Sequence, residues 1–128
     1  MDKNSNLFRG IRMAQEVAYS SSTYPDESHY IGFVGAEGGE AGVVAWLRTE
    51  GAEGRHLKAG MWRCEVSEFP YLFGVDETFV MIEGILRVAL EDGRSWDFGP
   101  GETASFLKGT RSTWTVVEPV LHFFIQTD

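Results

Sequence analysis

Residues 76–102 read DETFVMIEGILRVALEDGRSWDFGPGE, and no other part of the chain is as informative about fold class. Short apolar runs alternate here with turn-forming residues, EDGR at 91–94 and GPGE at 99–102. Glu83-Gly84 separates two further apolar runs and predicts a tight hairpin. Apolar runs of this length, bounded by such turns, predict β-strands rather than helices.

The rest of the chain continues this pattern. Apolar runs occupy residues 30–34, 43–47, 58–66, 69–73, 77–82, 85–90, 95–98, 103–107, 112–117 and 121–126. A short strand about every ten residues is typical of an all-β sandwich or barrel, so we expect little or no helix. We favour a jelly-roll barrel over an immunoglobulin-like sandwich, because the glycine–proline turn ends one strand and sharply starts the next.

Size and composition predict one folded domain. A chain of 128 residues is near the commonest domain size, and its 43% hydrophobic and 13% aromatic content excludes general disorder. We expect an N-terminal arm over 1–24, either loosely ordered or paired with a sheet edge. Residues 25–128 then form the single domain.

The charge balance narrows the choice of partners. Nineteen acidic against 11 basic residues give a net charge of -8, which disfavours nucleic acid and anionic membranes as partners. The one cysteine, Cys64, excludes an intrachain disulfide and is expected to be buried and unreactive. No signal peptide or membrane span is evident, and we expect a cytoplasmic protein.

Residues 60–126 resemble the cupin superfamily. They are most similar to small cupins related to the ureidoglycine aminohydrolase and ethanolamine-utilisation cupins. The matching stretches are 60–65, 76–84, 91–93, 99–102 and 108–114. The resemblance implies a cupin-type double-stranded β-helix, which is a jelly-roll barrel.

The family's metal-ligand positions are mostly lost. In the first motif Glu77 is retained, and Gly84 follows at the required spacing. The two histidine positions fall on Tyr71 and Phe73, or on Pro70 and Leu72 with the longer spacing. In the second motif Ser112 takes the place of the histidine. First-row metals in such sites need imidazole ligands, so we expect no cofactor and no histidine-ligated metal.

The cavity implied by the resemblance is aromatic. Strand alternation places Glu77, Phe79 and Met81 on one face, and Ser112 shares a face with Trp114. Apolar walls with few polar groups are typical of organic-ligand pockets. The predicted ligand-binding residues are Tyr71, Phe73, Glu77, Phe79, Met81, Ser112, Trp114 and His122.

Glu77 is the candidate catalytic residue. Desolvation raises the pKa of a buried carboxyl group, which suits general acid–base chemistry. The alternative, which we favour, is a buried glutamate whose hydrogen bonds come from Tyr71, Ser112 or water. Whether a nearby cation stabilises it is left open; the candidates are Arg63, Arg87 and Arg111.

His122 lies in the last apolar run, where either face of the strand fits the interior. If the even-numbered face points inward, His122 and Gln126 join Glu77 as a proton-transferring pair or a residual divalent-metal site. We favour the alternative, a histidine at the sheet surface. His29 and His56 are expected to be exposed.

Three functions follow from these features. The first is an uncharacterised small cupin that binds a small polar metabolite in its barrel. The second is a metal-independent isomerase, epimerase or hydrolase that uses Glu77. The third is a non-catalytic regulatory or structural subunit. We also expect a homodimer, because Thr78, Val80 and Ile82 form an outward face too apolar for solvent.

Overall fold

The computed structural model describes residues 16–19 and 26–128. The predicted arm therefore lies mostly outside the described residues. The strands are β1 (Ile31–Val34), β2 (Glu40–Arg48), β3 (Leu57–Cys64), β4 (Ser67–Leu72), β5 (Asp76–Leu90), β6 (Ser95–Phe98), β7 (Thr103–Phe106) and β8 (Arg111–Thr127). The only helical elements in the described part are two 3-10 turns, η1 (Glu27–His29) and η2 (Ala52–Gly54). The expected all-β fold is confirmed. Nowhere in these residues is there a helix of the length and hydrophobicity needed to cross a bilayer.

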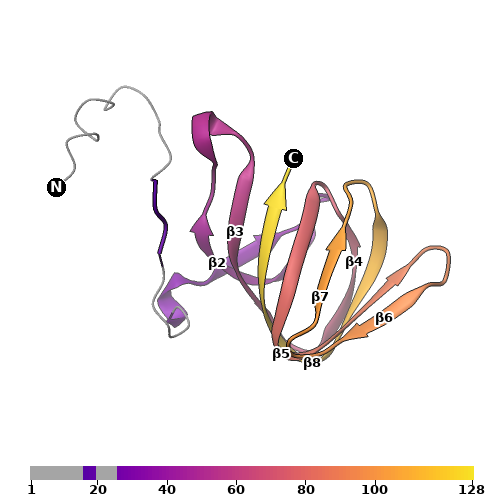
Figure 1. Ribbon diagram of the computed structural model, residues 1–128. Coiled ribbons are helices and arrows are strands. Elements are labelled where there is room, and N and C mark those ends of the chain that lie inside the picture. The colour runs from indigo at the N-terminus through magenta and orange to yellow at the C-terminus, as the bar shows by residue number, and fades with distance from the viewer. Residues whose placement is uncertain (1–15, 20–25) are drawn as a thin grey trace.

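The two long strands, β5 and β8, each belong to both layers of the barrel (Figure 1). The second half of β8 pairs with β3 and with the first half of β5. Adding the outer pairs gives one layer in the order β1-β2-β3-β8-β5-β7. The first half of β8 pairs with β4 and with the second half of β5, which gives β4-β8-β5-β6 in the other layer.

Both long strands change layer at Gly84 and Pro119. The β5–β8 register shifts between Met81 and Leu86, so the ladder is interrupted there. Gly84 has a φ of 86°, and a Cβ atom on it would lie 2.0 Å from the carbonyl oxygen of Pro119. Proline has no N–H to lose at such an interruption, which suits it to this position.

The hairpin predicted at Glu83-Gly84 is therefore wrong. The two halves of β5 pair with the two halves of β8 instead of with each other, so the glycine bends one continuous strand. The two turns predicted on either side of β6 are confirmed. The amide of Leu90 donates to Arg94 at 2.8 Å, and the amide of Glu102 donates to Gly99 at 3.1 Å.

Aromatic side chains fill the space between the layers. Trp114 lies at the centre of this core, with its ring 5.4 Å from Trp62, 5.9 Å from Phe73 and 5.9 Å from Phe79. Phe73 and Phe106 stack at 4.7 Å. Such pairs contribute packing energy beyond their buried area, so the interior is held largely by ring contacts.

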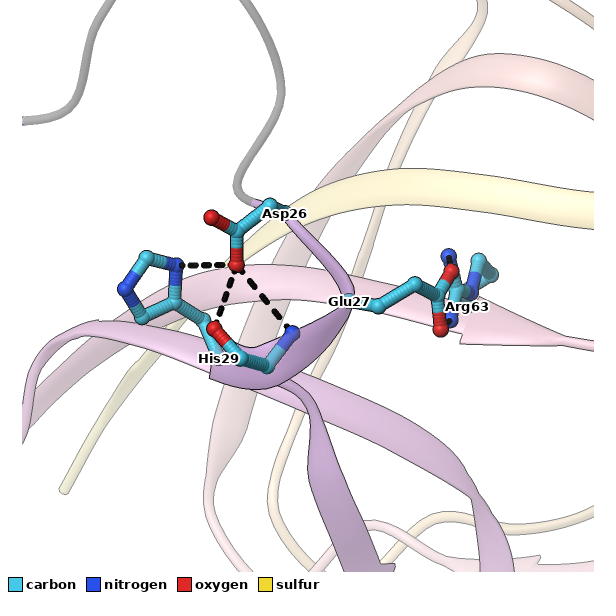
Figure 2. A network of polar contacts seen from close by, with 5 residues as sticks. Asp26, Glu27, His29 and Arg63 are labelled. Atoms are coloured by element: carbon cyan, nitrogen blue, oxygen red, sulfur yellow. Dashed lines mark hydrogen bonds and ion pairs between the residues drawn. The ribbon is translucent and has the colours of Figure 1, made fainter.

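The chain leading into β1 is fastened to β3 by a polar network (Figure 2). Asp26 precedes η1, and its Oδ1 lies 3.3 Å from Nδ1 of His29. Arg63 of β3 donates to both carboxylate oxygens of Glu27, at 2.6 and 2.8 Å. The guanidinium also lies 4.2 Å from the ring of Tyr30. These contacts position the N-terminal entry beside β3.

Replacing Gly84 with alanine is expected to lower the free energy of unfolding by about 3 kcal/mol or more. The new Cβ would meet the backbone of Pro119, and alanine would also have to adopt a left-handed backbone conformation. Gly93 is the matched control, since its φ is 96° but no atom lies within 4 Å of the added Cβ. Gly93→Ala should cost only about 1–2 kcal/mol. Urea unfolding measures both variants, and equal losses would contradict the role of the close approach.

Candidate ligand-binding site

Glu77 is buried and hydrogen-bonded at the end of the core. Its side chain is 4% exposed, and its Oε1 accepts from the hydroxyl of Tyr71 at 2.9 Å and from Nε2 of Gln126 at 3.0 Å. Gln126 lies directly opposite Glu77 across the β5–β8 ladder, which explains the contact. Burial raises the pKa of Glu77, while the two donated hydrogen bonds oppose that rise. The position expected for Glu77 is confirmed.

Tyr71 is held as a hydrogen-bond donor. Burial and the neighbouring Glu77 carboxyl both raise the pKa of its phenol. Its ring packs 4.5 Å from Trp114 and 4.9 Å from Phe73. The hydroxyl of Ser112 donates to the backbone oxygen of Tyr71 at 2.8 Å, so Ser112 positions this strand rather than bonding Glu77.

His122 lies inside the barrel, contrary to the favoured prediction of a surface position. Its ring is 1% exposed, stacked 4.6 Å from Phe79 and 4.9 Å from Trp62. Burial lowers its pKa to about 3, so the imidazole is neutral near pH 7. Its Nδ1 has no hydrogen-bond partner among the described residues. His122 and Glu77 line the same small cavity, but the partners that the described residues give Glu77 are Tyr71 and Gln126 and not His122.

The space left inside the core is small. A cavity of about 10 Å³ is lined by Tyr71, Glu77, Trp114 and His122 together with apolar rings. That volume holds about one water molecule. Phe73, Phe79, Met81 and Ser112 are also buried, and they serve as packing and strand contacts. The ligand-binding roles of these interior residues stay predictions.

None of the three candidate arginines reaches Glu77. They form exposed ion pairs instead, which are Arg63–Glu27, Arg87–Asp97 and Arg111–Glu37. The bonds that satisfy Glu77 therefore come from neutral groups. This outcome agrees with the favoured expectation of a hydrogen-bonded buried glutamate, with Gln126 in the place of Ser112 or water.

A larger open space, which we call the mouth groove, lies where β3 begins and β8 ends. Its volume is about 350 Å³. Its lining consists of Gly32, Phe33, Val34, Gly35, Ala36, Val44, Trp46, His56, Lys58, Tyr71, Gly74, Val75 and Gln126. Tyr71 and Gln126 line this groove and also bond Glu77, so they form the boundary between the groove and the interior.

His56 belongs to this groove, so the expectation that it is exposed is wrong. It is half-buried just before β3, and its Nε2 is covered and has no hydrogen-bond partner among the described residues. His29, as expected, is exposed, with 66% of its side chain in solvent. Lys58 and Trp46 also line the groove, and neither was predicted from the sequence as a site residue. One signal was present for Lys58. It is four residues from buried Trp62 on the same strand, so alternation places the two side chains on the same, inward face.

A second groove lies on the other side of Tyr71. It measures about 210 Å³ and is bordered by Ser112, Thr113 and Leu90 among others. Glu37 and Arg111 also line it, and they join the β1–β2 loop to β8 through a contact of 3.1 Å.

Comparison with known proteins identifies the family. A family model described as the EutQ-like cupin domain matches residues 51–123, which is more than half of the chain. The chain belongs to this family. The resemblance to cupins and the jelly-roll fold are thereby confirmed. No curated protein matches this EutQ-like cupin.

Solved structures share its fold at low sequence identity. The EutQ protein of Clostridium difficile is 21% identical with a TM-score of 0.63, over 82% of this chain and 80% of its own. A putative ethanolamine utilization protein Q of Salmonella typhimurium is 17% identical with a TM-score of 0.59, over 77% and 93%. Ectoine synthase from P. lautus is 12% identical with a TM-score of 0.63, over 80% and 70%.

The residues at the cupin metal position do not fit a first-row metal. Tyr71 is a protonated phenol, Phe73 has no donor atom, and the Ser112 hydroxyl is engaged by the backbone. Only Glu77 is a good metal ligand. Across residues 16–19 and 26–128, no three histidine, cysteine, aspartate or glutamate side chains gather as a metal site requires. We therefore derive no chemistry through a metal.

His122→Leu is expected to change the pH dependence of stability. The pKa of His122 is about 3 in the folded protein, and the ordinary value of a histidine is 6.5. As the pH falls below 6.5, the unfolded chain therefore binds a proton at His122 that the folded protein does not bind. The native protein thus loses stability with acidity, by about 2 kcal/mol between pH 7 and pH 5, and the leucine variant escapes this loss. Urea unfolding at both pH values measures it. His29→Gln, at an exposed site, is the control, and parallel curves for wild type and His122→Leu would contradict the expectation.

Proposed function

We propose that this EutQ-like cupin binds a small polar molecule in the mouth groove, without a histidine-ligated metal. The observation that carries this proposal is the placement of Tyr71 and Gln126, which line the groove while donating to buried Glu77. A groove of about 350 Å³ falls within the size range of small-molecule sites. Aromatic walls with a few fixed polar groups are also the usual composition of such sites.

Binding fits the geometry better than catalysis at Glu77. Its carboxyl lines the small interior cavity and not the groove, and its Oε1 is occupied by two donors. A general acid or base must lie within hydrogen-bond reach of the reacting group. The Tyr71 hydroxyl stands between a groove ligand and Glu77, so isomerisation, epimerisation or hydrolysis through Glu77 would need a relay.

A fragment screen by NMR tests the proposal. Sugars, amides, amino acids and carboxylates are added separately, and the indole N–H signals of Trp46 and Trp96 are followed. We expect binders to shift Trp46, which lines the groove, and to leave exposed Trp96 unchanged.

Tyr71→Phe should weaken such binders by about three- to tenfold through the lost hydroxyl. Thr113→Ala, which alters only the second groove, should not weaken them. If no compound shifts Trp46, the binding proposal fails, and a regulatory or structural subunit becomes the better hypothesis.

We further propose a homodimer formed through the outer face of the β5–β8–β3 layer. Thr78 faces outward opposite Ile125, which is 39% exposed, and Val80 and Ile82 on the same strand are only half-buried. A second copy seated on this face would remove apolar surface from water.

Ile125→Glu tests this interface by placing a charge on β8, the middle strand of the face, between Ala59 and Thr78. Sedimentation velocity at micromolar concentration should give a dimer for the wild type and a monomer for the variant. Val117→Glu is the matched control. Val117 is 40% exposed, but it lies in the first half of β8, which pairs with β4 and with the second half of β5 in the other layer. A monomeric wild type would overturn the proposal.

A further inference from the structure

Nearly every cation in the described part of the chain has a recorded polar partner. Six of them lie within 4.0 Å of an acidic side chain, which are Arg55, Arg63, Arg87, Arg94, Lys108 and Arg111. Arg48 donates to the backbone oxygen of Glu16. Lys58 is the exception. Its ammonium has no hydrogen bond or ion pair within residues 16–19 and 26–128, and its one recorded contact is with the Trp46 ring, 5.4 Å away.

The unpaired lysine faces the mouth groove. Lys58 lies opposite Gln126 in the β3–β8 ladder, so the two side chains project to the same side, toward the end of the barrel. Lys58 is half-buried, and among the described residues it is the only Lys, Arg, Asp or Glu that lines the groove. A chain with 19 acidic residues therefore presents an uncompensated positive charge at this one concave site.

Resting on the proposed function, we infer that the ligand of the mouth groove is a small organic monocarboxylate whose carboxylate pairs with Lys58. The walls beside Lys58 are the rings of Trp46 and Phe33, 6.3 Å apart, and they would contact the apolar body of such a ligand. Tyr71 and Gln126 lie at the inner end, where a polar substituent would meet them.

The charge of the site favours one carboxylate over a phosphate. A single ammonium balances a single negative charge, and the part of the chain that the structure describes places no arginine or second lysine in the groove lining for the second charge of a phosphate.

Matched carboxylates and amides test the inference. Acetate, butyrate and benzoate are titrated alongside acetamide, butyramide and benzamide, and the Trp46 indole signal reports binding. At least one carboxylate should bind on the order of tenfold more tightly than its amide, since a charge-assisted contact is lost in the neutral compound.

Two variants of Lys58 separate charge from shape. Lys58→Gln should abolish the preference for the carboxylate over its matched amide, whereas Lys58→Arg should keep the preference. Lys108→Gln, at an exposed lysine remote from the groove lining, is the control for net charge. Thermal unfolding establishes that each variant is folded.

The outcomes distinguish the two proposals. If neutral compounds shift Trp46 but no carboxylate is preferred, or if Lys58→Gln keeps the preference, the monocarboxylate inference is overturned while the binding proposal stands. If no compound of either class shifts Trp46, the monocarboxylate inference is overturned, and the binding proposal falls with it when the sugars and amino acids also leave Trp46 unchanged.

Discussion

Two antiparallel strands can serve both layers of a barrel only if their backbones pass one another closely at the bend. In this chain that passage is the contact between Gly84 and Pro119, where any side chain on residue 84 would meet a carbonyl oxygen. One half of each strand then enters each layer. Glu77 and Gln126 come to lie opposite each other at one end, and Ser112 and Trp114 come from the other half of β8. The site is therefore a product of the bend.

Aromatic side chains that pack the core occupy the expected metal-ligand positions in the interior. At the positions where the cupin resemblance implies histidines, the chain has a phenol and a phenyl ring packed against Trp114, and the remaining carboxyl is bonded by neutral donors. The one interior histidine is neutral and stacked between rings. The charged side chain available to a ligand is therefore Lys58, which lies at the rim of the barrel beside the groove. The candidate ligand-binding site is accordingly at the rim and not at the centre of the barrel.

The resemblance to cupins predicted that the face carrying Glu77, Phe79 and Met81 points inward, and their burial agrees with this. Strand alternation is the local signal that placed these three residues on one face. It failed at Glu83-Gly84, because a glycine that bends a strand and a glycine that reverses a chain look alike without knowledge of the pairing partner. It left His122 undecided, since the last strand has apolar residues on both faces. The mouth groove was out of reach for a different reason. Its lining comes from β1, β2, β3, β4, β8 and three loops, and only the tertiary fold brings Lys58 beside Gln126.

The clamp between Arg63 and Glu27 has a consequence for assembly. Arg63 lies on the same face of β3 as Ala59, because the two are an even number of residues apart. Ala59 is opposite Ile125 on β8, so Arg63 shares the outer face that carries Ile125. A second copy docking on that face would meet the N-terminal entry of the chain, and the two would compete for area. The clamp is solvent-exposed, with Glu27 81% accessible, and dissolved salt weakens such pairs. If the proposed dimer forms on this face, a rise in ionic strength would weaken the clamp and so change how the N-terminal entry and the second copy share the surface.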